Sequence, residues 1–449
     1  MFDDTPIGPD LNHPDAMIRL VSAVHRFQCP EMLQARKVNY QKSFSSAAVH
    51  SSTKELMKKA DQYRTLLAEN IVNSRRSKTT PQKSVMQSTQ QYLPYLQCIL
   101  LSCMMQSDQA KLNKKLTFEW ASGLEQANKQ SYHSEALMYE LVMTIACEGI
   151  ATAGNACDDS LDGKFPIASK GFAKAAGIFQ CLAEDQLPKW ISNGTNVEAA
   201  NLPCEVSVPI CDAFRMFYLA VGQQMAIATV LMKPGVPNYS LLAKLCKGVE
   251  ELMESFIVTM RSKASDKMGK LDESFLTLVT MQMTLQYCLS MYFLARSIWD
   301  KGEEYGLAIA MMHDAIQNMQ TRQSVTSKGM PEITKKSPLK ALEPDLIACR
   351  VHLQQVLEAW EKDNSSVYFD KVPTKISETR KIAKGVVMVK AQEFNLEEVD
   401  PLPLGDPNDT SSPPSYEKAT SQTNVFANMD EDEALARELQ EKLNRGEID

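Results

Sequence analysis

The stretch SEALMYELVMTIACEGIATAGNA (residues 134–156) and the stretch ASKGFAKAAGIFQCLAE (168–184) that follows it decide the fold. Both are rich in helix-forming residues, and their apolar residues recur at spacings of three and four, the period of an α-helix. The same pattern extends from about Ser52 to Glu361, and the two-residue alternation of half-buried strands is nearly absent from it. The sequence therefore predicts an all-α fold.

Two of the predicted helical hairpins share an aromatic, small, small pattern at an offset of 140 residues. Its members are Phe165, Ala168 and Ala175 in one hairpin and Tyr305, Ala308 and Ala315 in the other, with Gly163 and Gly302 just upstream. Alanine leaves room where two helices cross, as in tetratricopeptide-type repeats, although ordinary helix packing also produces such matches. We expect a helical solenoid, which offers extended binding surfaces rather than an enclosed pocket.

Composition and charge narrow the functional class. The chain has 449 residues, is 44% hydrophobic and 23% charged, and carries a net charge of −7, as a soluble globular protein does. The segment from Asp400 onward carries −8 and the preceding body +1, so no basic field indicates a nucleic-acid partner. Leu276 to Leu294 is uncharged, but its Thr and Gln residues favour a buried helix over a transmembrane one.

Catalytic and metal-binding motifs are absent from the sequence. The six histidines show no HExxH spacing, the eleven cysteines contain no CxxC pair, and there is neither a glycine-rich phosphate loop nor a GxSxG elbow. We therefore expect no enzyme activity, metal or cofactor; a Cys and His pair that meets only in space is the alternative. The scattered cysteines and the lack of a secretory signal in MFDDTPIGPD (1–10) predict a reducing, cytoplasmic location.

The character of the chain changes after Asn364. VYFDKVP (367–373) and KGVVMVKAQEF (384–394) favour extended structure and predict a minor β element. We expect a divergent amino-terminal segment at residues 1–50 and the helical domain at residues 51–395. A disordered linker rich in Pro, Ser and Asp should follow at residues 396–428, and an acidic amphipathic helix at residues 429–445.

The predicted linker contains a PPxY motif formed by Pro413, Pro414 and Tyr416. Such segments hold a preformed polyproline II shape that docks between the aromatic side chains of WW domains at little entropic cost. A WW-containing HECT ubiquitin ligase is the implied partner, and a plain spacer is the alternative.

The predicted terminal helix resembles the inverted ubiquitin-interacting motif. Acidic residues from Asp430 to Glu433, among them Asp432, precede Leu435, Ala436 and Leu439 on one side of the helix. The resemblance implies that the small Ala436 lets the helix lie flat on ubiquitin. Leu443 stands where the pattern has a later acid, and an acidic helix with another role is the alternative.

Five passages together resemble the Bro-one domain, the adaptor domain of ALIX-type proteins in the ESCRT pathway. They are LTFEWASGLE (116–125), the two stretches quoted first, FYLAVGQQMAIATVLMK (217–233) and SSVYFDKVPTKISETRKIAKGVVMVK (365–390). The likeness spans roughly residues 85–395. The first 50 residues differ from the usual opening, no long coiled-coil region follows, and the final residues GEID do not form a prenylation box, so the chain resembles the short members made of the domain plus a tail.

The resemblance implies a boomerang-shaped domain whose concave side takes the carboxyl-terminal helix of an ESCRT-III subunit of the Snf-seven class. The family's binding residues correspond to Leu241, Leu245, Met225 and Ala226. It further implies a non-catalytic adaptor that is cytoplasmic and recruited to endosomes. Two alternatives stay open: these residues are simply core, or the solenoid is a tetratricopeptide-like scaffold for an unrelated peptide.

Overall fold

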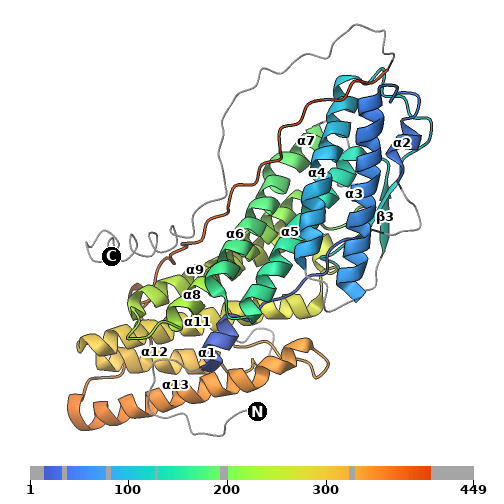
Figure 1. Cartoon of the computed structure of the whole chain (residues 1–449). Helices are drawn as coiled ribbons and strands as arrows, with labels where there is room; N and C mark the ends of the chain where they lie inside the picture. Colours follow the sequence, from blue (N-terminus) through green and yellow to red (C-terminus); the bar gives the residue numbers. More distant parts are fainter. Residues whose placement is uncertain are drawn as a thin grey trace. The chain divides into compact units, whose positions relative to one another are not determined.

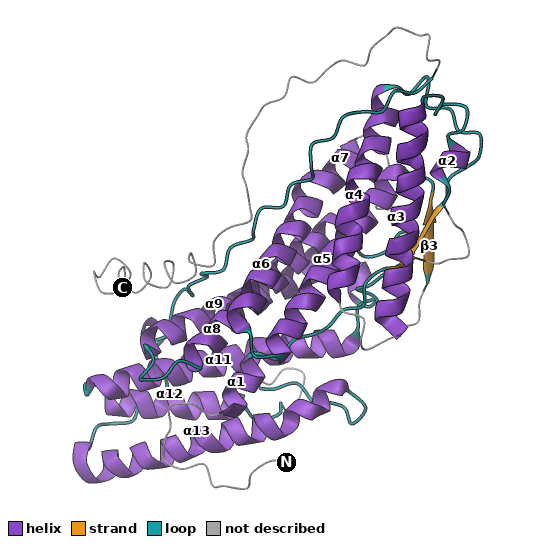
Figure 2. Ribbon diagram, viewed as in Figure 1, coloured by secondary structure: helices purple, strands orange, loops and turns teal. Residues whose placement is uncertain are grey.

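The computed structural model describes residues 15–32, 38–76, 82–126, 130–192, 201–322 and 329–405. The chain divides into two units, Met1–Asp409 and Thr410–Asp449, and all described residues belong to the first. Helices dominate this unit (Figure 2), which confirms the predicted all-α class.

The long helices form a stack in which each packs against the one before it (Figure 1). They are α3 (Ser51–Arg76), α4 (Gln82–Met105), α5 (Leu137–Leu161), α6 (Phe165–Cys181), α8 (Val208–Leu231), α9 (Tyr239–Lys263), α11 (Glu273–Lys301), α12 (Tyr305–Asn318) and α13 (Glu343–Asp363). The short helical elements are α1 (Asp15–Val21), α2 (Tyr40–Ser43), α7 (Leu187–Ser192), α10 (Ser265–Met268), the π turns η1 (Leu182–Gln186) and η3 (Asn364–Tyr368), and the 3-10 turns η2 (Pro338–Leu342) and η4 (Glu378–Arg380). Consecutive antiparallel packing of this kind is the solenoid that the sequence predicts.

The two hairpins that share a spacing have the same turn. Gly163 between α5 and α6 and Gly302 between α11 and α12 have φ angles of 75° and 76°, in the left-handed region where a side chain is strained. The four alanines of the pattern are fully buried: Ala168, Ala175, Ala308 and Ala315. Their small side chains allow close helix contact, as expected.

The small antiparallel sheet lies elsewhere than predicted. It consists of β1 (Glu31–Met32), β2 (Phe118–Ala121) and β3 (Ser131–Ser134) in that order, with Trp120 paired to Met32 on one side and to Tyr132 on the other. Residues 367–373 and 384–394, where we expected the β element, form no strand, because their backbone lies against helices rather than beside another strand.

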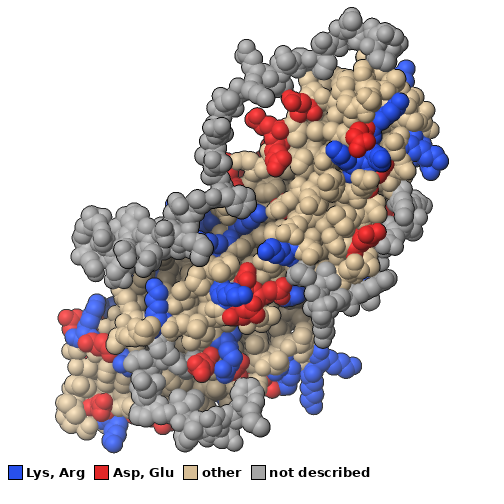
Figure 3. Space-filling view, in the orientation of Figure 1, with Lys and Arg blue, Asp and Glu red and all other residues tan. Residues whose placement is uncertain are grey.

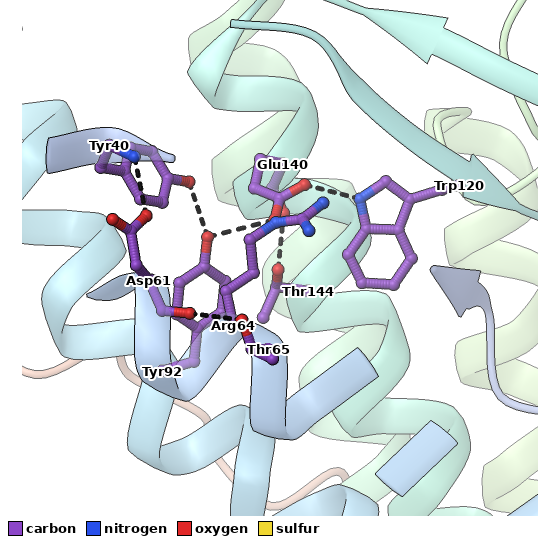
Figure 4. A network of polar contacts seen from close by, with 8 residues as sticks. All are labelled: Tyr40, Asp61, Arg64, Thr65, Tyr92, Trp120, Glu140 and Thr144. Atoms are coloured by element: carbon purple, nitrogen blue, oxygen red, sulfur yellow. Dashed lines mark hydrogen bonds and ion pairs between the residues drawn. The ribbon is translucent and has the colours of Figure 1, made fainter. Parts of the chain in front are cut away.

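A buried polar network joins this sheet to α3, α4 and α5 (Figure 4). The Glu140 carboxylate accepts hydrogen bonds from Arg64 Nε at 2.9 Å, Tyr92 Oη at 3.1 Å and Trp120 Nε1 at 2.7 Å. The hydroxyls of Tyr40 and Tyr92 are 2.6 Å apart, and burial together with the nearby Glu140 charge raises the pKa of both well above the ordinary value. Arg64 and Tyr92 both donate to Oε1 of Glu140, so the tryptophan of the LTFEW passage supplies the donor to Oε2 of this buried carboxylate.

One described helix, α5, is long and apolar enough to cross a membrane by length and composition, and 89% of its most apolar window is buried inside the molecule. The helix α11, which contains Leu276 to Leu294, does not pass that test and packs against α9 and α12. In the described part of the chain both are therefore core helices.

Candidate binding surface

Only part of the predicted binding set is accessible on the described surface. Leu241 near the start of α9 and Ala226 near the end of α8 are half-buried, whereas Leu245 is 1% exposed and Met225 is 0% exposed. The expectation that all four residues contact a partner therefore needs correction for Leu245 and Met225, which the structure buries. The reason is that α9 packs between α8 and α11, and a helix covered from two sides buries a wide apolar arc.

An extended segment, residues 382–405, runs across this face, and we call it the strap. It passes over α9, α8, α6 and α4 in turn (Figure 1). Val386 N donates to Lys244 O of α9 at 3.0 Å, and Gln392 N donates to Ala173 O of α6 at 3.0 Å. The strap is thus held by its backbone, as a bound peptide is.

Glycines mark the places where the strap crosses the helices. A Cβ on Gly248 of α9 would lie 2.3 Å from Val386 O, and a Cβ on Gly177 of α6 would lie 1.6 Å from Gln392 O. At Gly222 of α8 the nearest strap atom would be 3.2 Å away. Because any side chain at the first two positions would clash with backbone, these glycines fix the path of the strap.

The side chain of Gln223 clamps the strap at the α8 crossing. Its Nε2 donates to Val386 O at 2.7 Å and to Leu245 O at 2.9 Å, and its Oε1 accepts from Met388 N at 2.8 Å. Gln223 is fully buried, so each of these bonds also satisfies a polar atom that water does not reach.

The accessible apolar surface lies beside the strap. Gly222 and Gly248 face the strap, and Ala226 and Leu241 lie four and seven residues from them, on the same helix faces. On the strap itself Val387 is 41% exposed. Ala226 and Leu241 provide apolar contacts on two helices, and Val387 adds one on the strap. Sequence reasoning missed Val387 because the helices that the strap crosses come from distant parts of the chain.

Titratable side chains of the described residues were candidates for metal binding or nucleophilic chemistry. Within the described ranges, no group of three His, Cys, Asp or Glu side chains is placed to hold a metal ion. Burial raises the pKa of Cys103 and Cys181 to about 11, the opposite of what a nucleophilic thiolate needs, and lowers the pKa of His25 and His352 to about 4.

The predicted tail motifs lie outside the described residues. Pro413, Pro414 and Tyr416 of the PPxY motif belong to that part of the chain, as do the four positions of the ubiquitin-binding prediction, Asp432, Leu435, Ala436 and Leu439. Residues 396–405, which we expected to belong to the linker, are part of the strap: Leu402 and Leu404 are buried, and Leu402 N donates to Ser102 Oγ of α4 at 2.6 Å.

Comparison with solved structures shows the same fold. The structure described as "Structure basis for endosomal targeting by the Bro1 domain" matches with a TM-score of 0.63 at 15% identity, covering 83% of this chain and 93% of that one. The ALIX BRO1 complex with CHMP4C matches with a TM-score of 0.60 at 14% identity, covering 84% of this chain and 98% of that one. ALIX bound to the SIVmac239 PYKEVTEDL late domain matches with a TM-score of 0.61 at 13% identity. This match covers 84% of the present chain and 50% of the ALIX chain.

Sequence comparison identifies the family directly. No curated protein matches the chain. The family model described as BRO1-like domain, which is the Bro-one domain predicted from the motifs, matches residues 38–429. Since this match covers well over half of the sequence, the chain belongs to the BRO1-like domain family.

Proposed function

We propose that this protein is a non-catalytic adaptor that binds the carboxyl-terminal amphipathic helix of an ESCRT-III subunit of the Snf-seven class. The observation that carries the proposal is the apolar surface of Ala226, Leu241 and Val387 on a BRO1-like domain. An amphipathic helix presents apolar side chains at i, i+3, i+4 and i+7 and needs a complementary apolar strip of this kind.

The ALIX BRO1 domain, which has the same fold, has been solved in complex with CHMP4C. That likeness supports an ESCRT-III partner for this chain. Leu241 and Ala226 are the side chains we assign to direct contact. Leu245 and Met225 lie beneath them, so their contribution is to hold the surface in shape.

Titration of the full-length protein with a fluorescent peptide of the ESCRT-III carboxyl-terminal helix tests the proposal. We expect micromolar binding that Leu241→Asp weakens at least about tenfold, because a carboxylate replaces an apolar contact. Val258→Asp is the matched control, since Val258 is 56% exposed near the other end of α9. Equal loss in both variants, or no binding by the unaltered protein, contradicts the proposal.

The rival function is a tetratricopeptide-like scaffold for an unrelated peptide. The same titration separates the two, because a scaffold of that kind would not recognise the ESCRT-III helix. Recruitment to endosomes follows from the proposed partner, and a fluorescent fusion carrying Leu241→Asp should then lose its endosomal localisation.

We also propose that the tail recruits ubiquitin machinery. Pro413, Pro414 and Tyr416 are assigned to a WW domain of a HECT ligase, and pull-down by WW domains should be lost with Tyr416→Ala. Leu435, Ala436 and Leu439 are assigned to ubiquitin, and shifts in labelled ubiquitin spectra should disappear with Ala436→Gln. Unchanged signals in either variant would remove that part of the proposal.

A further inference from the structure

Three segments meet at one end of the helical stack, and we call this region the loop tip. It comprises residues 42–55, residues 104–115 and the end of the strap at 402–405. Asn113 N donates to Ser43 O at 2.8 Å, and Gly405 N donates to Ala47 O at 2.9 Å. These bonds join the start of α3, the end of α4 and the strap into one surface (Figure 1).

The loop tip exposes apolar side chains that the core does not use. Met104 is 60% exposed, Leu112 47%, Val49 38% and Met105 36%. They come from a helix end and two loops, so they do not form the i, i+4 stripe that a partner helix would need. Exposed apolar groups gathered on one surface indicate an interaction site.

The same segments are rich in lysine. The loop tip contains Lys42, Lys54, Lys111, Lys114 and Lys115 against only two acidic residues, Glu55 and Asp108. Figure 3 shows lysine and arginine side chains at this end of the molecule, together with a few acidic ones. Among the ion pairs of the described residues, one takes a loop-tip lysine, that of Lys115 with Glu135.

We propose that the loop tip binds an anionic lipid bilayer by inserting its apolar side chains between headgroups that the lysines neutralise. Because Glu135 offsets Lys115, the loop tip keeps a local excess of two positive charges, whereas the whole body of the chain up to residue 399 carries only +1. Each lysine near an anionic membrane strengthens binding about fivefold.

A bilayer fits this surface better than an acidic protein does. The four apolar side chains come from a helix end and two loops and not from one regular face, and a stable protein interface needs an area of about 800 Å² on each partner. Lipid headgroups, in contrast, rearrange around individual side chains, and methionine adapts readily to such an environment. This proposal does not rest on the ESCRT-III assignment, because it uses neither Leu241 nor the strap crossing.

Vesicle sedimentation of the full-length protein tests it. We expect binding to vesicles of phosphatidylcholine with about 30% phosphatidylserine and not to pure phosphatidylcholine. The variant Lys54→Glu, Lys111→Glu, Lys114→Glu should bind at least about 100-fold more weakly. The matched control places the same three charge changes on exposed lysines far along the chain, Lys335, Lys336 and Lys371, and should bind normally.

A second variant tests insertion directly. Met104→Ser with Leu112→Ser leaves every charge in place, and we expect about a tenfold loss of vesicle binding because the apolar contribution is removed. Because all substituted side chains are exposed, the variants should keep the unaltered thermal transition. No vesicle binding by the unaltered protein, equal loss in the control triple variant, or no effect of the serine variant overturns the proposal.

Discussion

Gly248→Ala should release the strap from α9 while leaving the helical stack folded. The new Cβ would lie 2.3 Å from Val386 O and 2.8 Å from Gln223 Nε2. A methyl group cannot share that space with a backbone carbonyl, and α9 is fixed between its neighbours, so the strap must move away.

The size of the effect follows from the bonds at this crossing. Displacement of Val386 and Met388 breaks three hydrogen bonds: Val386 N to Lys244 O, Gln223 to Val386 O and Met388 N to Gln223. At about 1 kcal/mol each, the free energy of local opening falls by about 3 kcal/mol. Alanine gains about 1 kcal/mol over glycine in a helix, so the global free energy of unfolding should fall by only about 2 kcal/mol.

Hydrogen exchange measured by mass spectrometry separates these two quantities. The amides of residues 382–392 should exchange about 100-fold faster in the variant, whereas urea unfolding reports the smaller global change. Gly269→Ala is the control, because a Cβ there meets nothing within 4 Å. Unchanged protection of the strap in Gly248→Ala, or equal acceleration in Gly269→Ala, would refute the reasoning.

Further predictions concern the core. Because Leu245 is 1% exposed, Leu245→Ala should lower the free energy of unfolding, measured in urea, by about 2 to 4 kcal/mol. A decrease no larger than that of a surface substitution would contradict the buried position of Leu245. Trp120→Phe leaves a buried oxygen of Glu140 without its donor and should cost about 1 to 3 kcal/mol by the same assay; a stable variant would show that the network is dispensable. Burial raises the pKa of Glu205 from 4.5 to about 7, so its protonated form favours the folded state fully below about pH 4.5, and this contribution is lost as the pH rises through 7. The free energy of unfolding should therefore fall by about 3 kcal/mol over that window, and Glu205→Gln should flatten the profile; identical pH profiles would contradict this.

Short-range patterns predicted the helical architecture because helix formation depends on nearby residues. The spacing of three and four gave the long helices, and the glycine before each aromatic, small, small pattern marked turns that both proved left-handed. The sheet was misplaced, because β2 and β3 are four residues long and pair across a loop, which leaves little periodicity to detect. The valines of residues 384–394 gave a strand-like pattern, but their partners are helix carbonyls and the Gln223 amide.

The sequence alone therefore determined the all-α class, the hairpins and the family, because each depends on residues close together in the chain. The tertiary structure decided which predicted binding residues reach the surface. Leu241 and Leu245 belong to the same stripe of α9, yet the packing of α8 and α11 buries only the second, and a strap from more than 130 residues away supplies Val387 beside the first. Exposure is set by which elements meet, and no local pattern contains that information.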